Sequence, residues 1–415
     1  MRRRFTLAAV AALAALVTAA GALAAGAGDT TGITKRTITL GGTFPLSGPA
    51  SSYAPIPVGM KAYFSYVNAT RTNGKRGVCG RQIVWKYLDD GYNPAQTVQQ
   101  TRALVDQDKV FATVGGLGTE PQLSVQQYLN QNKVPQLFVS TGATEFSDKP
   151  AEHPWTIGWQ PDYQAEGAVY GKYIAQHMPN AKIGIIYQND AYGLDYVEGL
   201  EAGLGSHKSQ IVTKQGFDVT APSLAQQVVA LKVANPDVVF IFGTPSPTIK
   251  TYATMKAVGF KPGTIFVNSV SATDTFMGFA VAKSSADEVN GSISTGYIMD
   301  PNNPKYKNTP GVKLYLKLMK KYAPKADPHE GLYMYGMAKA YDTVKLLQAI
   351  GPNPTRSKLQ QAWSHMNWTN PFLLPGIKVQ TNGAKDPYVI QQMKLVKFDN
   401  GLWNEVGNLL NGRGK

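Results

Sequence analysis

The chain is poor in cysteine and histidine, which limits the chemistry that its side chains can perform. Cys79 is the single cysteine in 415 residues, so no disulfide can form within the chain. It stands in a glycine-rich turn between a predicted helix and a predicted strand, where we expect a small loop residue rather than a functional thiol. The five histidines lie far apart and have no metal-ligand spacing. These residues therefore indicate no metal site and no other cofactor.

Motifs of common enzyme classes are also missing. The chain contains neither an H-E-x-x-H zinc signature nor a G-x-S-x-G nucleophile elbow. The pair Gly116-x-Gly118 stops short of the dinucleotide fingerprint, because Pro121 stands where the last glycine belongs. The adjacent acids Asp89 and Asp90 follow a predicted strand, and we expect them to be solvated at its end. We expect a binding protein without catalysis; a Rossmann-type dehydrogenase is the weaker alternative.

Long apolar stretches are absent beyond the first 27 residues. Residues 2–4 are arginines, residues 5–23 form an apolar run of mostly Ala and Leu, and small residues follow up to position 27. This pattern is typical of a cleavable export signal and is short for a membrane span, although an N-terminal anchor is the alternative. The arginines also loosely fit a twin-arginine signal, so the export route stays open. We expect cleavage near residues 24–27 and localisation in the periplasm.

Basic residues outnumber acidic ones without forming a block. Lys and Arg number 41 and Asp and Glu 27, which gives a formal net charge of +14. Because no block of five like charges occurs, a solvated basic surface is the simplest interpretation, and attraction of an anionic small ligand is the alternative. Nucleic acid is not expected as a partner. Without the predicted signal, about 388 residues remain, which is long enough for two domains.

Strand and helix signals alternate in two successive runs. Continuous apolar strands that alternate with helices indicate parallel strands covered on both faces, so two runs indicate two doubly wound α/β lobes. The first run has strands at 37–44, 83–88, 110–114 and 135–139, and helices at 58–69, from 93 to about 108, and from 121. The second has helices at 163–177, 192–204, 223–234 and 246–258, and strands at 183–187, 211–217, 237–242 and 264–268. Later strands at 291–297 and 389–398, and helices at 312–322, 331–350 and 355–366, make the lobes discontinuous if they return to both sheets.

Six ordered segments resemble the type I solute-binding proteins of ABC importers, of the Leu/Ile/Val-binding class. They span residues 40–53, 89–94, 115–119, 134–135, 140–144 and 187–193. The resemblance implies two α/β lobes joined by three crossovers, with a first lobe at 36–160 and 296–378 and a second at 161–295 and 379–412. It also implies closure of the lobes on a small ligand with a carboxylate, docking of a monomer on a membrane permease, and no cofactor. The same scaffold serves in ligand-sensing domains, which is the alternative.

The loop after the strand at 110–114 is the first candidate contact. Ligands of open α/β sheets bind beyond the carboxyl ends of the strands, and glycines before a helix N-terminus favour an anion. The resemblance implies that Leu117, Gly118 and Thr119 hold the ligand carboxylate. The alternative is internal, because Thr119 and Gln122 also fit a capping box that would satisfy the same amides.

Other candidates come from the resemblance alone. In the first lobe, Thr141, Gly142 and Thr144 would hold the polar end of the ligand, and Tyr53 would contact it; an ordinary polar turn and a surface tyrosine are the alternatives. In the second lobe, Tyr192 matches a cleft tyrosine, although it also fits an aromatic residue buried at a helix start. We expect a further contact from Thr244, which follows a predicted strand end. Tyr333 is a weaker aromatic candidate, since Tyr333 and Tyr341 fit core or surface positions better.

One departure from the family pattern concerns the ligand amine. Amino-acid binders of the class pair it with a carboxylate after the strand that corresponds to 264–267, but here 268–271 contains no acid. Ser271 is the best match, and Asp274 is the nearest acid. A buried ammonium without a charged partner is costly. Either Asp274 pairs with the amine of a hydrophobic amino acid, which we expect first, or the ligand is an aromatic or aliphatic carboxylate or amide without an amine.

Overall fold

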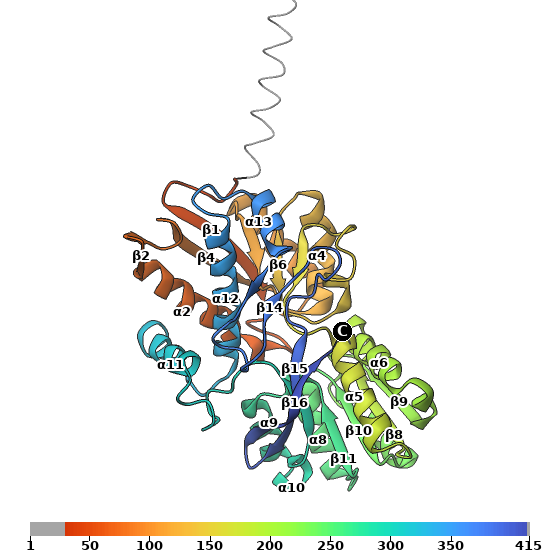
Figure 1. Ribbon diagram of the computed structural model, residues 1–415. Helices are drawn as coiled ribbons and strands as arrows, with labels where there is room; N and C mark the ends of the chain where they lie inside the picture. Colours follow the sequence, from red (N-terminus) through yellow and green to blue (C-terminus); the bar gives the residue numbers. More distant parts are fainter. Residues whose placement is uncertain (1–29, 413–415) are drawn as a thin grey trace, which may run out of the picture.

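The computed structural model describes residues 30–412, so the predicted export signal at 1–27 lies outside the described residues. The chain forms two lobes, one above the other in Figure 1, and each lobe is a β-sheet with helices on both faces. Within residues 30–412 no helix combines the length and the apolar character that a membrane span needs.

The first lobe is built on a five-stranded parallel sheet with the order β4-β1-β5-β6-β7. Every residue of β6 is buried, as expected for a parallel strand covered on both faces. Gly42 in β1 lets the neighbouring strand approach closely, since a Cβ there would lie 2.7 Å from the Val114 carbonyl oxygen. The strands are β1 (Thr37–Phe44), β4 (Gln82–Asp89), β5 (Ala112–Val114), β6 (Gln136–Val139) and β7 (Thr156–Gly158).

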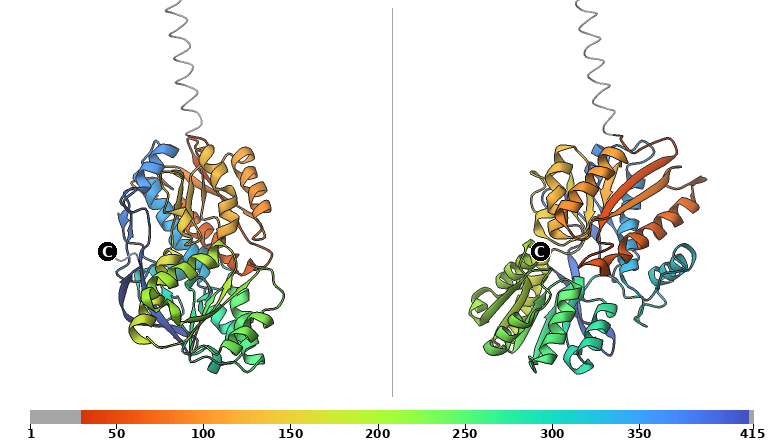
Figure 2. Two further views of the ribbon diagram at one scale, coloured as in Figure 1. Left: turned by 90° about the vertical axis from the view of Figure 1, so that its right-hand side faces the viewer. Right: turned by 180° about the vertical axis from the view of Figure 1, so that it is seen from behind.

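Two long helices pack tightly against one face of this sheet. Glycines stand where α2 and α12 cross: a Cβ on Gly59 or on Gly336 would lie 2.1 Å from a carbonyl oxygen of the other helix. The helices of this lobe are α2 (Pro55–Ala69), α3 (Pro94–Arg102), α4 (Thr119–Gln131), α11 (Pro310–Tyr322), α12 (Leu332–Ala349) and α13 (Arg356–Trp363). Figure 2 shows α12 and α13, in blue, beside the N-terminal elements in red and orange, from which they are far removed in sequence.

The second lobe has a seven-stranded sheet with the order β16-β15-β12-β11-β10-β8-β9. Its strands are parallel except β15, which is antiparallel to both β12 and β16. The strands are β8 (Ile183–Gln188), β9 (Ile211–Phe217), β10 (Val238–Phe242), β11 (Thr264–Val267), β12 (Ile293–Gly296), β15 (Gln392–Asp399) and β16 (Leu402–Asn411). Its helices are α5 (Tyr163–His177), α6 (Ala191–Leu204), α7 (Ala225–Ala234), α8 (Pro245–Ala257), α9 (Asp274–Lys283) and α10 (Ala286–Val289).

The chain passes between the lobes three times. It leaves the first sheet after β7, returns to the first lobe after β12, and comes back to the second sheet before β15. The prediction of two doubly wound lobes with three crossovers is therefore confirmed. A hairpin of β2 (Arg71–Thr72) and β3 (Lys75–Arg76) precedes Cys79, which is a free thiol in a turn with φ of 51°.

Some elements differ from the sequence-based expectations. The helix predicted to reach residue 108 ends at Arg102 and continues as one wider turn, while α4 begins at Thr119 instead of 121. The short strand β7, the helix α9 and the polar strand β16 were not predicted. Three residues are too few for a periodic signal, and β16 alternates poorly because much of it is exposed.

Candidate ligand-binding site between the lobes

A pocket lies between the two lobes and receives side chains from both and from the segments that connect them. The space open to the centres of water molecules is about 160 Å³. Because one buried water needs about 10–15 Å³ on this measure, the pocket can hold on the order of ten waters or one small molecule. Contacts such as the hydrogen bond from Tyr53 Oη to the Val270 carbonyl oxygen, 3.2 Å, join the lobes beside it.

Most of the predicted contact residues line this pocket, and four do not. The residues in the lining are Tyr53, Leu117, Gly118, Thr119, Tyr192, Thr244 and Asp274. Those outside it are Thr141, Gly142, Thr144 and Ser271, all of which are buried or tightly packed. Tyr333 is also outside the lining; it packs against the core of the first lobe, and Tyr335 takes a place in the pocket instead.

The N-terminus of α4 faces the pocket without a side-chain cap. Its N-cap is Gly118, with φ of 103°, so the capping box that the sequence permits does not form. Thr119 Oγ1 instead lies 2.7 Å from Thr141 Oγ1, and the Gln122 amide donates to Thr43. Uncapped amides at a helix N-terminus attract an anion. Thr141 thus supports Thr119 from behind the pocket wall.

The acidic residue in this loop is turned away. Glu120 Oε1 accepts a hydrogen bond from the Ala191 backbone nitrogen, 3.0 Å, at the start of α6 in the other lobe. Glu120 does not belong to the lining. The Glu120 carboxylate therefore binds the N-terminus of α6 and does not occupy the N-terminus of α4, which faces the pocket.

A buried lysine stands behind the first-lobe wall. Lys339 Nζ donates to Ser140 Oγ at 2.5 Å and to Tyr335 Oη at 3.0 Å, and it lies 5.0 Å from the centre of the Trp159 ring. Burial lowers the pKa of Lys339 well below its usual value, and the charge of Asp342 opposes this change. None of the ion pairs within residues 30–412 includes Lys339, so its buried amine lacks a directly bound carboxylate.

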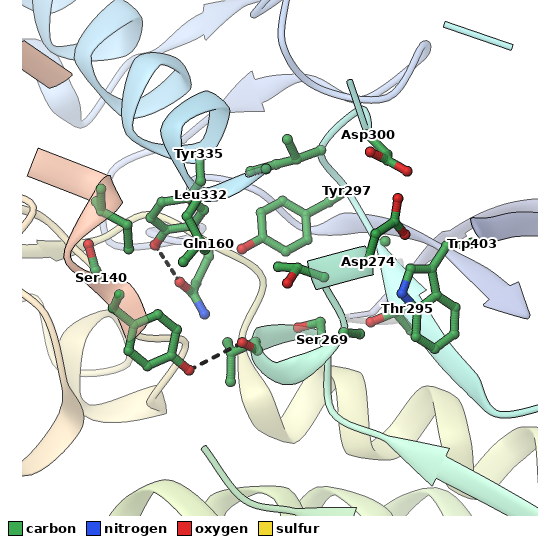
Figure 3. Close-up of a pocket in the computed structure, with 18 of the residues that line it drawn as sticks. Ser140, Gln160, Ser269, Asp274, Thr295, Tyr297, Asp300, Leu332, Tyr335 and Trp403 are labelled. Atoms are coloured by element: carbon green, nitrogen blue, oxygen red, sulfur yellow. Dashed lines mark hydrogen bonds between the residues drawn. The ribbon is translucent and has the colours of Figure 1, made fainter. Parts of the chain in front are cut away.

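A chain of hydrogen bonds links Lys339 to the pocket lining. Tyr335 Oη donates to Gln160 Oε1 at 2.7 Å, as Figure 3 shows, and Gln160 Nε2 lies 3.2 Å from Tyr163 Oη. Ser140, Gln160, Tyr163 and Tyr335 all line the pocket. The first-lobe side of the pocket therefore presents polar groups that are connected to the buried amine of Lys339.

Thr144 contacts carboxylates of the protein. Its backbone nitrogen donates to Asp195 Oδ2 at 2.9 Å, and its hydroxyl donates to Asp162 Oδ2 at 2.8 Å. Burial, and then the charge of Asp162, raise the pKa of Asp195 to about 7. Gly142 is covered by Tyr163, whose backbone nitrogen donates to the Gly142 carbonyl. This loop therefore joins the first lobe to α6 and stands one layer behind the pocket.

The segment 268–271, which contains no acid, brings Ser269 rather than Ser271 into the pocket lining. Ser269 lines the pocket and donates to Glu166 through its backbone nitrogen, 2.7 Å, and its hydroxyl, 2.6 Å. Tyr170 and Tyr196 donate to the same carboxylate. Glu166 thus has four donors within the protein and no lone pair left for a ligand amine. Ser271 is turned away and donates to the Gly243 carbonyl at 2.7 Å.

The second-lobe wall is largely aromatic. Tyr192 is 2% exposed, and no donor or acceptor of the described residues bonds its hydroxyl. Its ring lies edge-on to Tyr163 with centroids 5.3 Å apart. Thr244 donates to Gln188 Oε1 at 3.1 Å, which holds its methyl group at the cavity surface. An apolar ligand body fits these walls better than a polar one.

Two acids line the far side of the pocket. Asp274 is the first residue of α9, and Asp300 follows β12 in the segment that returns to the first lobe. In Figure 3 both lie with Trp403 on one side of the pocket, and Ser140, Gln160 and Tyr335 lie on the other, with Tyr297 between. No group of three or more His, Cys, Asp or Glu side chains within the described part of the chain is arranged to hold a metal ion.

The comparisons with known proteins agree with this architecture. The family model of a periplasmic binding protein matches residues 37–401. The chain belongs to this family. It is 22% identical to Leu/Ile/Val-binding protein homolog 2 of Brucella abortus over 373 residues, which is 88% of this chain and 92% of that protein. It is 24% identical to homolog 3 of Brucella melitensis over 210 residues, but that match spans only about half of either protein: 50% of this chain and 54% of the homolog.

Solved structures of other periplasmic binding proteins share the fold. One is a branched-chain amino acid ABC transporter protein from Thermus thermophilus with bound valine, with a TM-score of 0.79, 17% identity, and coverage of 91% of this chain and 97% of that one. Another is a fatty acid ABC transporter substrate-binding protein from Thermomonospora curvata, with a TM-score of 0.75, 19% identity, and coverage of 92% and 94%. The predicted resemblance to the Leu/Ile/Val-binding class is confirmed.

Membership of this family sets the general role of the site. Periplasmic binding proteins are exported substrate-binding proteins, not enzymes; they bind small molecules and work with the permeases of ABC transporters. A pocket between two lobes is the feature that this role requires.

Several residues of the pocket escaped the sequence-based prediction. They are Ser140, Gln160, Tyr163, Ser269, Tyr297, Asp300, Tyr335 and Trp403, with Lys339 behind them. A signal was available for two of these residues: Tyr335 and Lys339 are four apart on one helix, and a lysine on an otherwise apolar helix face marks a buried charge. Asp300 and Trp403 stand in segments without any periodic pattern.

Proposed function

We propose that this protein is the exported substrate-binding protein of an ABC importer and captures a small carboxylate with an apolar body between its lobes. Closure of the lobes would commit the ligand, and the loaded monomer would dock on a membrane permease. A hydrophobic amino acid of the branched-chain type is the first candidate. The second is an aromatic or aliphatic carboxylate or amide without an α-amine, and a ligand-sensing role is the remaining alternative.

The observation that carries this proposal is the uncapped N-terminus of α4 at an apolar pocket. Thr119 lines the cavity at this N-terminus and offers its hydroxyl, whereas the Gly118 amide donates to the Ser140 carbonyl. Glu120 is engaged by the other lobe. Lys339 stands behind the neighbouring Ser140. A carboxylate is the small anionic group that suits such a set of donors.

One observation favours a ligand without an α-amine. The segment 268–271, where the class is expected to have its amine-pairing acid, contributes Ser269 to the pocket lining, and the carboxylate behind Ser269, Glu166, already accepts four hydrogen bonds. An α-ammonium beside the carboxylate site would therefore be buried without a charged partner. The fatty acid ABC transporter substrate-binding protein from Thermomonospora curvata, which has the same fold, is an example of a neighbour whose ligand class lacks an amine.

A ligand screen by thermal unfolding tests the proposal. A ligand that binds the native state raises the melting temperature by mass action. The mature protein is screened against leucine, isoleucine, valine and phenylalanine, and against the deaminated analogues 4-methylpentanoate and phenylpropanoate. We expect at least one carboxylate to raise the melting temperature, and tighter binding of the deaminated partner if the α-amine is unpaired. No shift with any compound of either set would reject the proposal.

A further inference from the structure

The Asp274–Asp300 pair is a built polar site within the pocket. The two carboxyl groups come from different parts of the chain, the N-terminus of α9 and the segment after β12, and are held against each other and against Trp403. Burial, followed by the hydrogen bond and the charge of Asp300, raises the pKa of Asp274 to about 9. Near neutral pH the Asp274 carboxyl therefore holds a proton, and a hydrogen bond joins it to Asp300.

The protein supplies no donor of standard geometry to most of these oxygens. Both oxygens of Asp274 and Oδ2 of Asp300 are buried without a hydrogen-bond partner among the described residues. The Asn302 side chain and the Trp403 backbone nitrogen lie near enough to lower the pKa of Asp274, but neither makes such a bond. Buried polar groups are usually hydrogen-bonded, so this concentration of exceptions in one place points to a ligand.

Trp403 provides a second, independent sign. Its side chain is 7% exposed and lines the pocket, and its indole nitrogen has no hydrogen-bond acceptor among the described residues. The indole is thus a buried donor beside two buried acceptors. An aromatic ring at this position also attracts a cation through its face.

The charged neighbours of the pair are engaged elsewhere. Glu405 on β16 is held by Lys305 at 2.9 Å and Lys394 at 2.6 Å, and it also accepts a hydrogen bond from Tyr306. His329, in the loop before α12, contacts Asn302 Oδ1 through Nδ1 at 2.7 Å. No ion pair within residues 30–412 includes Asp274 or Asp300. No cation among the described residues therefore pairs with either acid.

We propose that Asp274 and Asp300 bind a cationic nitrogen at the end of the ligand that is remote from its carboxylate. The donors of the first lobe lie on the opposite side of the pocket, with Tyr297 between the two ends. The ammonium of an α-amino acid is attached next to its carboxylate and does not extend to the acid pair. The ligand class is thus an ω-amino acid or a related molecule with an apolar middle. This inference rests on the proposed function and accounts for the serine at the usual amine position.

Binding of such a cation exchanges it for a proton. The ammonium group stabilises the ionised form of Asp274, so the proton of that carboxyl leaves to solvent when the ligand enters. An alkanoate of equal length binds without this exchange. Proton release therefore separates a cation at the acid pair from any effect of the carboxylate end.

Calorimetry with matched probes tests the inference. Titrations near pH 7.5 in two buffers of different ionisation enthalpy give the number of protons released per ligand. The probes are ω-amino carboxylates of four to eight carbons, the alkanoates of the same lengths, and leucine. For one length we expect the ω-amino acid to bind at least tenfold more tightly than its alkanoate, and to release close to one more proton.

Asp274→Asn and Asp300→Asn test whether the two acids cause the preference for the ω-amino acid. Each should abolish the advantage of the ω-amino acid and the extra proton, while alkanoate affinity stays within about threefold of wild type. Asp287→Asn removes an exposed acid of the same lobe and should change neither quantity. Melting temperature and circular dichroism establish that each variant is folded.

The outcomes separate this inference from the proposed function. If an alkanoate or leucine binds but no ω-amino acid is preferred, or if both acid-pair variants keep the preference, the acid pair is a structural contact and the inference is wrong. If no carboxylate of any kind binds, the proposed function fails first.

Discussion

The two ends of the pocket are built in opposite ways. At the first-lobe end the groups are donors and are tied together: Lys339, Ser140, Tyr335 and Gln160 form one connected network. At the other end the groups are acids, and most of their oxygens lack donors. A connected hydrogen-bond network fixes its geometry before a ligand arrives. Buried acids without donors destabilise the empty pocket relative to a pocket that holds a ligand with donors. Under the proposal, the first end would orient the ligand and the second would select it.

The largest change in ligand affinity should come from replacing the buried Lys339 at the first-lobe end. Lys339→Met should lower carboxylate affinity by roughly 2–5 kcal/mol, the usual cost of stranding a buried charge. The unfolding free energy should be unchanged or higher, because the methionine fills the same space without a desolvated charge. Titration calorimetry and denaturant unfolding measure the two quantities.

The control is Lys345→Met on the same helix, which removes a half-buried lysine away from the pocket. It should leave carboxylate affinity unchanged. If Lys339→Met destabilises the fold and affinity stays at the wild-type value, the lysine supports only the packing of α12 and the two ends of the pocket do not differ in charge.

A smaller change in affinity should distinguish Thr119 from Thr144, which were both predicted from the sequence to contact the ligand. Thr119→Ala removes a hydroxyl at the pocket and should weaken carboxylate binding by about 1.5–3 kcal/mol, as for a hydrogen bond to a charged group. Thr144→Ala removes a hydroxyl that contacts Asp162 and Asp195, so it should lower stability more than intrinsic affinity. Calorimetry and unfolding of both variants check this. Equal loss of affinity in the two would place Thr144 at the ligand after all.

A pH effect should mark the contact between the lobes. The pKa of Asp195 is raised to about 7, so between its ordinary value and about pH 7 the native state holds a proton that the unfolded chain has lost. Stability from this group therefore falls as pH rises through that range. Asp195→Asn keeps an acceptor for Thr144 and should remove this part of the slope, measured as melting temperature between pH 4 and about pH 8.

Glu198→Gln, an exposed acid on the same helix, is the matched control and should retain the wild-type slope. If the melting temperature of Asp195→Asn depends on pH as steeply as that of the wild type, Asp195 does not hold a proton in this contact.

The smallest effect should come from the tyrosine hydroxyl of the second-lobe wall. Tyr192→Phe deletes a buried hydroxyl that has no partner among the described residues, so stability should be equal or slightly higher. If the hydroxyl meets the ligand, affinity should fall by about 0.5–1.5 kcal/mol. Tyr252→Phe breaks the hydrogen bond to Ser292 outside the pocket, and it should reduce stability without changing affinity. If Tyr192→Phe lowers stability and leaves affinity unchanged, the hydroxyl of Tyr192 belongs to the core and does not meet the ligand.

Local patterns predicted the fold well because each strand and helix has its own signal. The helix at 163–177 and the strands at 37–44 and 211–217 were predicted with the bounds that the structure has. The loops after β5 and β6 were also predicted to face one edge, since the carboxyl ends of parallel strands meet there. In the loop after β6, however, Ser140 lines the pocket and Thr144 does not. The following turn and Tyr163 cover the rest of the loop.

By itself, the sequence determined the two α/β lobes, and it predicted a ligand site at the strand ends, because apolar periodicity and strand polarity are local properties. Only the tertiary structure decided which charges face the pocket. Lys339, Asp300 and Trp403 are far from the first strands in sequence, and the three crossovers bring them to the same cavity. Whether a charge is neutralised, shared or left for a ligand depends on burial and on its neighbours in space, and no local pattern contains either.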